Sequence, residues 1–394
     1  MPMEEFDNKQ KTKRHLSKKI VLSLSIIFLG MIVIGVGAYM AVSFYQSRNG
    51  TFTGYEVVNS IENPGGAAAS YNTYGDMLLK YTRDGATTYN SEAKLEWNGS
   101  YEMIDPISDV CGKYVAVADR NGRLVHIFGE KGPVGSITTE YPILQVQVAN
   151  QGVTAVMMEQ DNVVYINLYK SNGTLIAPIE KPIEVAGFPL SMALSNDGKK
   201  VAFSFLDVTT GTAKTNIACY NFGPVGQNEE NNFVGGFIYE GVIAKVDFIT
   251  NNTVCFYRQN GFTVYHFEEK LSENPVEDLT FESQIRSIFS SNSMIGVVLD
   301  SDEDKSKYEL QLYDLKGKQI LKKGINYDYS GITMNGSDVV LYNYSSCMIV
   351  SSKGKIRFQS SFDCNVQQVS ETTKGRIVLV SDDAIQVIQL KGGK

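Results

Sequence analysis

The sequence predicts an all-β body built from a repeated antiparallel unit and preceded by one transmembrane helix. Three observations support this prediction: a strand-rich composition, an apolar unit that recurs along the chain, and one long uncharged stretch near the N-terminus. The 394 residues include 22 Tyr, 19 Phe and 35 Gly but a single Trp, and aromatic residues are enriched in strands. With 43% hydrophobic and 20% charged residues, the chain has globular composition, which excludes disorder throughout.

The first segment, residues 1–19, is a basic tail. It carries six basic and three acidic residues. Because the whole chain has a formal net charge of −7, a tail of +3 leaves −10 for the remainder. An acidic body without a basic stripe repels phosphate backbones, so nucleic acid is not expected as a partner.

The second segment, residues 20–44, reads IVLSLSIIFLGMIVIGVGAYMAVSF and contains no charge. At about 1.5 Å per residue, a helix of this length exceeds the ~30 Å hydrocarbon core of a bilayer. We expect the membrane anchor to include Ile20, Phe28, Gly37, Ala41 and Phe44.

Basic residues beside the anchor set its orientation, because cytoplasmic flanks are enriched in Lys and Arg. The residues in question are Lys13, Arg14, Lys18 and Lys19. They predict a cytoplasmic N-terminus and an extracytoplasmic C-terminal domain at the cell membrane. A cleaved signal peptide is the alternative, but its apolar region is shorter and ends in an A-x-A-like site, so a retained anchor fits better.

Helix dimerisation within the membrane has only a weak signal. Gly37 and Ala41 have the small-xxx-small spacing that lets two helices approach closely in lipid. Small residues are common in membrane helices.

Beyond the anchor, one apolar strand recurs eight times. It reads MLLKYT, YVAVAD, VTAVMM, VAFSFL, VCFYR, IGVVLD, VVLYNY and IVLV, starting at Met77, Tyr114, Val153, Val201, Val254, Ile295, Val339 and Ile377. These starts are separated by 37, 39, 48, 53, 41, 44 and 38 residues. The average period of about 43 residues is typical of four-stranded propeller blades.

Turn residues surround each recurring strand and define the rest of the unit. The strand leads through turns such as Asp119-Arg120-Asn121-Gly122 into a partner strand, which is a hairpin pattern. A second turn follows the partner, for example Lys316-Gly317, and an alternating segment such as ILQVQVA precedes the unit. Each unit therefore has four strands.

The repeat predicts a β-propeller of eight four-stranded antiparallel blades, with seven blades as the alternative if residues 77–97 merge with the C-terminal unit. Ring closure protects sheet edges that isolated blades would expose. The last unit ends after its third strand, AIQVIQL, so YEVVNSI near Tyr55 could supply the missing fourth strand. We expect residues 45–70 to be a linker containing this closing strand, and residues 71–394 to form the propeller. Asn63-Pro64-Gly65-Gly66 looks flexible.

One stretch resembles a known family. MLLKYTRDGATTYN from Met77, the following Glu96-Trp97, and YVAVADRNGRLVHIF from Tyr114 are similar to uncharacterised single-pass membrane propellers of Gram-positive, clostridia-type bacteria, a domain of unknown function. The resemblance covers roughly residues 10–390. The hairpins also resemble those of PQQ-dependent quinoprotein propellers. Those enzymes repeat a tryptophan in every blade, whereas this chain has only Trp97. The resemblance implies architecture and no cofactor.

Few residues are suited to chemistry. Outside the tail, which holds His15, the histidines are His126 and His266, both in partner strands where packed or rim positions are common. The five cysteines have no metal-ligand spacing and are expected to be small buried hydrophobes, with a Cys347–Cys364 disulfide as the alternative. No catalytic, cofactor or metal residue is predicted.

Acidic clusters supply the other candidates. The segment 300–304, DSDED, begins like a calcium loop but has Lys305 where the loop needs glycine and Gln311 where it needs glutamate. A solvated hairpin tip is the better interpretation. Two pairs of adjacent acids lie on expected loops: Glu229 with Glu230, and Asp382 with Asp383.

Two functions remain open. The first is a membrane-anchored extracytoplasmic module that binds or scaffolds an envelope protein or glycan. The alternative is a glycan-active enzyme whose carboxylates converge at the propeller axis, since glycoside hydrolysis needs two carboxyl groups facing one substrate. A sensor is a weaker reading, because a 19-residue tail is too short to hold a signalling domain.

Overall fold

The computed structural model describes residues 31–35, 37, 50–209, 211–302, 305–372 and 376–392. Residues 53–391 form one compact unit, and residues 1–52 with 392–394 form a second. No helix in these described ranges combines the length and the hydrophobicity needed to cross a membrane. Residues 31–35 and 37 are helical; the rest of the predicted anchor, including Ile20, Phe28, Ala41 and Phe44, and the basic tail lie outside the described residues.

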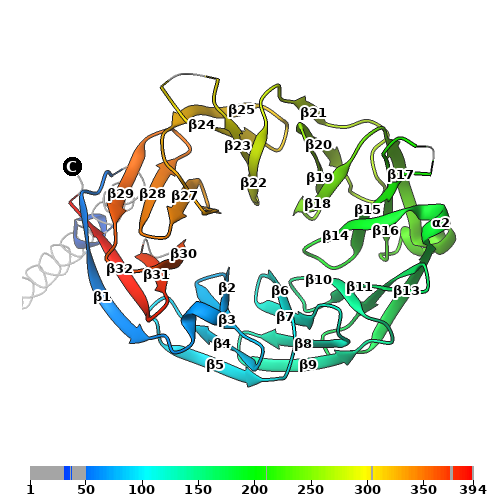
Figure 1. The fold of residues 1–394 in the computed structure, drawn as a ribbon, viewed down its shortest axis with the longest axis horizontal. Helices are drawn as coiled ribbons and strands as arrows, with labels where there is room; N and C mark the ends of the chain where they lie inside the picture. Colours follow the sequence, from blue (N-terminus) through cyan, green and yellow to red (C-terminus); the bar gives the residue numbers. More distant parts are fainter. Residues whose placement is uncertain are drawn as a thin grey trace, which may run out of the picture. The chain divides into compact units, whose positions relative to one another are not determined.

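The larger unit is a ring of four-stranded antiparallel sheets (Figure 1). Eight such sheets occur within residues 53–391 as far as they are described, which confirms the eight-bladed prediction. Residues 77–97 belong to a blade of their own, so the seven-bladed alternative is wrong. In each blade the strands follow one another from the central opening outward (Figure 1).

Seven blades are built from consecutive strands. Blade 1 comprises β2 Ser70–Tyr74, β3 Met77–Tyr81, β4 Gly85–Tyr89 and β5 Leu95–Ser100, and blade 2 comprises β6 Pro106–Cys111, β7 Tyr114–Asp119, β8 Leu124–Gly129 and β9 Gly132–Thr138. Blade 3 comprises β10 Ile143–Val148, β11 Thr154–Gln160, β12 Val163–Tyr169 and β13 Leu175–Pro182. Blade 4 comprises β14 Phe188–Leu194, β15 Lys200–Asp207, β16 Lys214–Asn221 and β17 Phe233–Tyr239. Blade 5 comprises β18 Ile243–Thr250, β19 Thr253–Arg258, β20 Gly261–His266 and β21 Glu277–Thr280. Blade 6 comprises β22 Ile285–Ser291, β23 Met294–Asp300, β24 Tyr308–Asp314 and β25 Gln319–Ile325. Blade 7 comprises β26 Gly331–Asn335, β27 Asp338–Asn343, β28 Ser346–Ser351 and β29 Ile356–Ser361. Short helices interrupt the connections at η1 Gly66–Ala68, α2 Ile183–Ala186, η2 Gly226–Asn228 and η3 Glu230–Asn232.

Blade 8 joins the two ends of the unit. It contains β30 (Val366–Glu371), β31 (Arg376–Ser381) and β32 (Ala384–Lys391), and its outer strand is β1 (Gly54–Glu62) from the start of the unit. β1 pairs antiparallel with β32 along its length. The segment YEVVNSI lies within this closing strand.

The core lies between neighbouring blades. The second strand of each blade is apolar and buried on both faces; in β7, the side chains of Val115 to Ala118 are 0% exposed. Each hydrophobic cluster joins two adjacent blades, as where Trp97 of blade 1 stacks on Phe128 of blade 2 with ring centroids 4.7 Å apart. Each blade needs a neighbour on both sides to bury its two faces, and a closed ring provides one for every blade.

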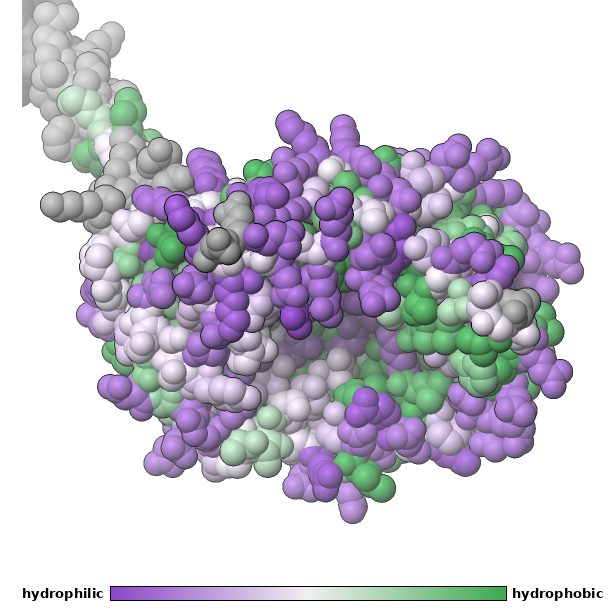
Figure 2. Space-filling view, turned by 45° about the horizontal axis from the view of Figure 1, so that its top comes forward, coloured by the Kyte–Doolittle hydropathy of each residue, from purple (hydrophilic) through white to green (hydrophobic). Residues whose placement is uncertain are grey.

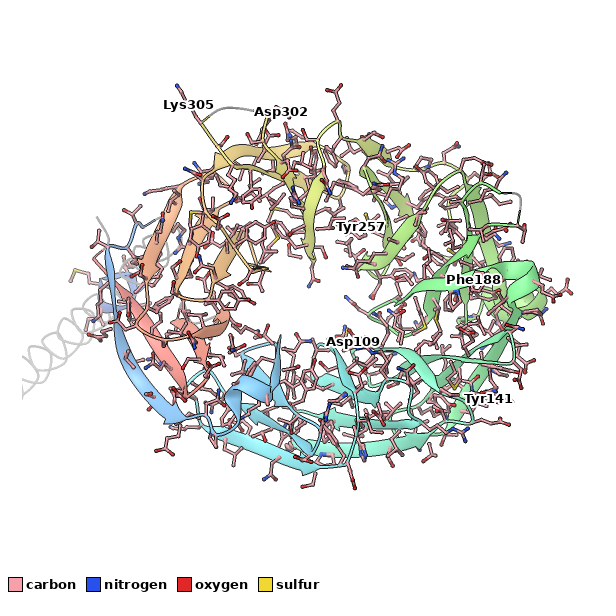
Figure 3. All side chains as sticks on the ribbon, viewed as in Figure 1. Asp109, Tyr141, Phe188, Tyr257, Asp302 and Lys305 are labelled. Atoms are coloured by element: carbon pink, nitrogen blue, oxygen red, sulfur yellow. The ribbon has the colours of Figure 1, made fainter. Side chains whose placement is uncertain are left out.

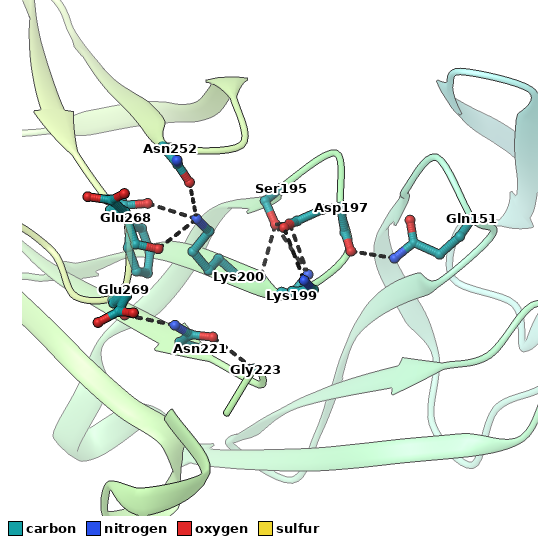
Figure 4. A network of polar contacts seen from close by, with 11 residues as sticks. Gln151, Ser195, Asp197, Lys199, Lys200, Asn221, Gly223, Asn252, Glu268 and Glu269 are labelled. Atoms are coloured by element: carbon teal, nitrogen blue, oxygen red, sulfur yellow. Dashed lines mark hydrogen bonds and ion pairs between the residues drawn. The ribbon is translucent and has the colours of Figure 1, made fainter. Parts of the chain in front are cut away.

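Polar contacts also join neighbouring blades (Figure 4). The Lys200 side chain is buried, and its Nζ donates to Asn252 Oδ1 at 2.6 Å and to the carbonyl oxygens of Phe267 and Glu268 at 2.9 Å. These acceptors belong to blade 5, whereas Lys200 begins the second strand of blade 4. Burial lowers the pKa of Lys200, and three hydrogen bonds satisfy the donors of its ammonium group.

The segment around Asn63 is ordered, in contrast to the expected flexible linker. The Asn63 side chain is 1% exposed, donates to the Ser381 carbonyl at 2.7 Å and to Tyr71 Oη at 2.8 Å, and accepts from Lys80 Nζ at 2.7 Å. Three strands of two blades therefore meet at one amide. The turn at Asn63-Pro64-Gly65-Gly66 is held in place by these hydrogen bonds of the Asn63 side chain.

Strand direction assigns each loop to one of two faces. Because strands alternate in direction, the hairpin between the second and third strands and the link to the next blade leave from the same face. We call this the connection face; it includes the hairpin 259–260 and the link 281–284. In the view of Figure 2 the surface is largely hydrophilic and hollowed at the centre of the ring.

Candidate functional site

A polar groove lies on the connection face over blades 5 and 6. It consists of a cavity of about 560 Å³ and a neighbouring one of about 300 Å³, which share Glu282 and Ser283 on the link between the blades. Ligand sites in proteins typically have volumes of this order. The groove is therefore the candidate functional site.

Three connections form the first cavity: the link 240–242, the hairpin 259–260 and the link 281–284. Its side chains are mostly polar. They include Tyr239, Arg258, Gln259, Asn260, Glu282, Ser283 and Gln284.

Arg258 is the buried charge of this cavity. The residue is 8% exposed, and its Nη2 donates to Asp278 Oδ1 at 2.5 Å and to the Leu279 carbonyl oxygen at 2.8 Å. Among the residues that the structure describes, Nη1 reaches only Tyr239 Oη, at 3.5 Å, and the centre of the Tyr239 ring lies 5.5 Å from the guanidinium carbon. Nε makes no hydrogen bond to the described residues. One side of the guanidinium is thus saturated and the other is not.

Glycine at position 261 makes room for the Arg258 guanidinium. A Cβ at Gly261 would lie 2.0 Å from the Leu279 carbonyl oxygen and 2.8 Å from Arg258 Nη2. Thr263 Oγ1 donates to Asp278 Oδ1 at 2.9 Å and helps to hold that carboxylate. The Asn260-Gly261 turn therefore both reverses the chain and seats Arg258.

The second cavity is more acidic. Its lining includes Asp300, Asp302 and Glu309 against one cation, Lys322, whose Nζ lies 3.1 Å from Glu309. Ser283 Oγ donates to Asp302 at 2.9 Å. Figure 3 shows Asp302 and Lys305 on the hairpin that projects from blade 6.

A second candidate region is the central channel, beside which Asp109 lies (Figure 3). Asp109 is on the inner strand of blade 2 and accepts from the Val148 backbone N–H of blade 3 at 2.7 Å. Burial raises the pKa of Asp109 to about 7, and the carboxylate of Asp247 on the inner strand of blade 5 adds to this rise. Burial also raises the pKa of Asp247, while Lys245 opposes the rise.

The histidines and cysteines of the sequence do not form a site. His126 stacks on Tyr101 with ring centroids 5.4 Å apart, and burial lowers its pKa; His266 is exposed at the end of β20. All five cysteines are free thiols, and Cys347 is buried, so the alternative of a Cys347–Cys364 disulfide is wrong. Among the described residues, no group of three His, Cys, Asp or Glu could hold a metal ion.

The acidic candidates of the sequence are dispersed. Asp300 ends β23 and pairs with Arg286 Nε at 2.6 Å; residues 303 and 304 lie outside the described residues. Glu229 pairs with Lys270 at 2.6 Å, and Asp382 accepts from Asn365 at 3.1 Å.

Sequence reasoning missed Arg258 and the groove. A signal was present, because VCFYR is an apolar strand that ends in a charge immediately before an Asn-Gly turn. Its contacts come from β21 and from Tyr239 of blade 4, which are distant in the sequence.

Comparison with known proteins places the chain in a family. Residues 48–390 match the family described as Family of unknown function (DUF5711). The chain belongs to this family. The predicted resemblance to a domain of unknown function is thereby confirmed. No curated protein matches this chain.

Solved structures share the fold of this DUF5711 member. BamB from Moraxella catarrhalis is 11% identical, with a TM-score of 0.53 over 86% of this chain and 98% of its own. Apo AztD from Citrobacter koseri is 12% identical, with a TM-score of 0.49 over 83% of this chain and 89% of its own. At 11% identity, the likeness to BamB shows the fold alone.

Proposed function

We propose that this DUF5711 protein is a membrane-anchored, extracytoplasmic module that binds an envelope glycan in the groove over blades 5 and 6. The observation that carries the proposal is the groove itself, two adjoining cavities lined by amides, hydroxyls, carboxylates and one buried guanidinium. Such side chains offer both donors and acceptors, which a polymer of hydroxyl groups requires. Loops at one face of a repeat ring are also where binding residues concentrate.

The membrane part of the proposal rests on the uncharged residues 20–44 and the basic residues Lys13, Arg14, Lys18 and Lys19. The described part of this segment agrees with it: residues 31–35 are helical, and the apolar side chains of Met31 to Ile34 are exposed. We place the N-terminus in the cytoplasm and the propeller outside, in a Gram-positive, clostridia-type cell.

Photo-crosslinking tests the binding site. A photoreactive amino acid at Gln284, in the groove, should form an adduct with envelope polysaccharide on intact cells. The control is the same amino acid at Lys131, an exposed residue on the opposite face, which should form none. A protein adduct at Gln284 would replace the glycan with a protein partner, and equal labelling at both positions would reject the groove.

Thiol labelling tests the topology. In a background with Cys111 and Cys364 changed to serine, Lys131→Cys should react with a membrane-impermeant maleimide on intact cells, whereas Ser17→Cys should react only after lysis. The reverse pattern, or recovery of the chain in the soluble fraction, would reject the anchored arrangement.

A second candidate, a glycan-active enzyme, is favoured by the two channel carboxylates. Asp109 and Asp247 come from different blades and interact electrostatically, and a carboxyl with a pKa of about 7 can donate a proton at neutral pH. The full chain should then release reducing ends from isolated envelope polysaccharide, and Asp109→Asn with Asp247→Asn should abolish the release. Equal rates in both proteins would exclude this candidate.

A further inference from the structure

We infer that the cavity over blade 5 binds the carboxylate of a sugar acid, such as a uronic acid unit in a glycan, through Arg258. This inference rests on the proposed glycan-binding function and names the chemical class of the ligand. It is argued from the unfilled donors of a buried guanidinium, the charge of its surroundings and the polar lining of the cavity.

Donor counting identifies the recognising atom. A guanidinium has five N–H donors. In Arg258, Nη2 contacts Asp278 and the Leu279 carbonyl oxygen, whereas Nε is shielded from solvent and has no partner among the described residues. Nη1 has one contact at 3.5 Å, the outer limit of a hydrogen bond. Since Arg258 lines the cavity, Nη1 is the nitrogen with donor capacity left for a ligand.

An oxyanion is the ligand that best matches this donor. Charge-assisted hydrogen bonds from arginine to carboxylate or phosphate are about twice as strong as neutral ones. The one contact of Nη1 is long, so a ligand oxygen at a shorter distance would give this nitrogen a stronger acceptor than Tyr239 provides. Asp278 already occupies the opposite edge of the guanidinium, and the ligand would complete the shell.

The surrounding charge favours a monoanion over phosphate. Glu282 lines the same cavity, and Asp300, Asp302 and Glu309 line the adjoining one with Lys322 as the cation. A doubly charged phosphate would be repelled more strongly by these acids than a carboxylate would. Among oxyanions, the charge of the lining therefore favours a carboxylate over phosphate at Arg258.

The remaining lining favours a sugar as the bearer of this carboxylate. Gln259, Asn260, Ser283 and Gln284 present amide and hydroxyl groups that donate and accept, and Tyr239 adds an aromatic ring. The volume of about 560 Å³ is within the range of small-molecule sites. A hydroxyl-rich ring with one carboxylate matches this set.

Binding assays on the purified full chain test the inference. Isothermal titration should show that a trimer of galacturonic acid binds at least about tenfold more tightly than a trimer of galactose, and inorganic phosphate should not compete. Equal affinity for the charged and neutral trimers, or competition by phosphate at concentrations similar to that of galacturonate, would overturn the assignment of a carboxylate.

Charge variants at an exposed position test the site without disturbing Arg258. Gln259 is exposed and lines the cavity. Measured relative to neutral-trimer binding in the same variant, Gln259→Glu should weaken and Gln259→Lys should strengthen galacturonate binding, each by about three- to tenfold at low salt. Identical galacturonate affinity in both variants would overturn the location.

Arg258→Lys should reduce galacturonate affinity at least about tenfold, because lysine lacks the planar fork of donors. The matched control is Arg120→Lys, at the corresponding hairpin of blade 2, where Arg120 is exposed and pairs with Asp105 at 2.7 Å. A melting curve for each variant separates lost binding from lost folding.

If cross-linking at Gln284 captures glycan but galacturonate fails to bind, this inference fails alone. If no glycan is captured and galacturonate does not bind, the proposed function fails as well.

Discussion

At the residue scale, Lys200 is a buried charge that several partners satisfy. Lys200 is 3% exposed and bonds three oxygens of the next blade, whereas its neighbour Lys199 is exposed and lies 4.0 Å from Asp197. Replacing Lys200 with methionine would keep the stem but remove the donor that these three oxygens share. The two adjacent lysines therefore form a matched pair for experiment.

Lys200→Met should lower the free energy of unfolding by about 1–2 kcal/mol, since the Phe267 carbonyl is left buried without this donor, whereas Asn252 and Glu268 are exposed and can bond water. Lys199→Met should change it by less than about 0.5 kcal/mol. Urea denaturation followed by tyrosine fluorescence measures both. Similar losses in the two variants would show that the blade-to-blade contact contributes nothing.

Asp109 gives the residue-scale pH dependence. Its folded pKa of about 7 exceeds the unfolded value of about 3.9, so the folded state binds the proton more tightly. The resulting stability is present below about pH 4 and is lost as the pH rises through about 7.

Between pH 5.5 and 7.5, the free energy of unfolding of the unmodified protein should therefore fall by up to about 2 kcal/mol more than that of Asp109→Asn. Asparagine keeps an oxygen for the Val148 N–H, and Asp247 is retained in both proteins, so the difference isolates Asp109. Urea titrations at three pH values measure it; parallel pH profiles would contradict the raised pKa.

At the element scale, β1 closes the ring, and Asn63 fixes its end. The side chain bonds the Ser381 carbonyl of β31 and the Tyr71 hydroxyl of β2, and it receives Lys80 Nζ of β3. The burial of Lys80 depends on this amide, because the other acceptor of Nζ is the Pro64 carbonyl oxygen. A single amide thus links the closing strand to blades 1 and 8.

Asn63→Ala should destabilise the protein by about 3 kcal/mol, since three hydrogen bonds are lost and Lys80 keeps a buried charge with one fewer partner. Asn98→Ala, at an exposed position on the outer strand of blade 1, is the control and should have little effect. Hydrogen exchange should show the loss first in β1 and β32. Uniform protection in both variants would argue against a closing role for Asn63.

At the scale of the whole molecule, ring closure couples every blade to its neighbours. The hydrophobic clusters lie between blades, as in the cluster that joins Leu78 and Ala93 of blade 1 to Val380 and Ile385 of blade 8. Removing one blade therefore exposes the faces of two others. Stability in such a ring is a property of the closed structure.

Deleting residues 377–394 removes most of β31 and all of β32, the partner of β1. The truncated protein should lose the single cooperative thermal transition and become sensitive to protease in all blades. Deleting residues 392–394 alone, beyond the last strand, should leave the melting temperature unchanged. An unchanged melting temperature in the longer deletion would refute coupling through closure.

Local pattern was sufficient to predict the blades, because their determinants are local. Alternating apolar residues make strands such as β7, and Asn-Gly or Asp-Gly turns make hairpins wherever they occur in a sequence. Eight copies at a regular period indicated the propeller. The groove was not predictable in this way, because the surroundings of Arg258 come from Asp278, Leu279 and Tyr239, which only the packing of blades 4 and 5 brings to it.

By itself, the sequence determined the all-β class and the four-stranded repeat, since strand period and turn chemistry act over a few residues, whereas the structure decided for eight blades over seven. Only the tertiary structure decided that Asn63 is a buried closure residue, that Asp109 and Asp247 interact from different blades, and that a guanidinium with spare donors lines a cavity. Burial, electrostatic interaction and cavity shape depend on distances between segments far apart in the chain, and those distances exist only once the ring has closed.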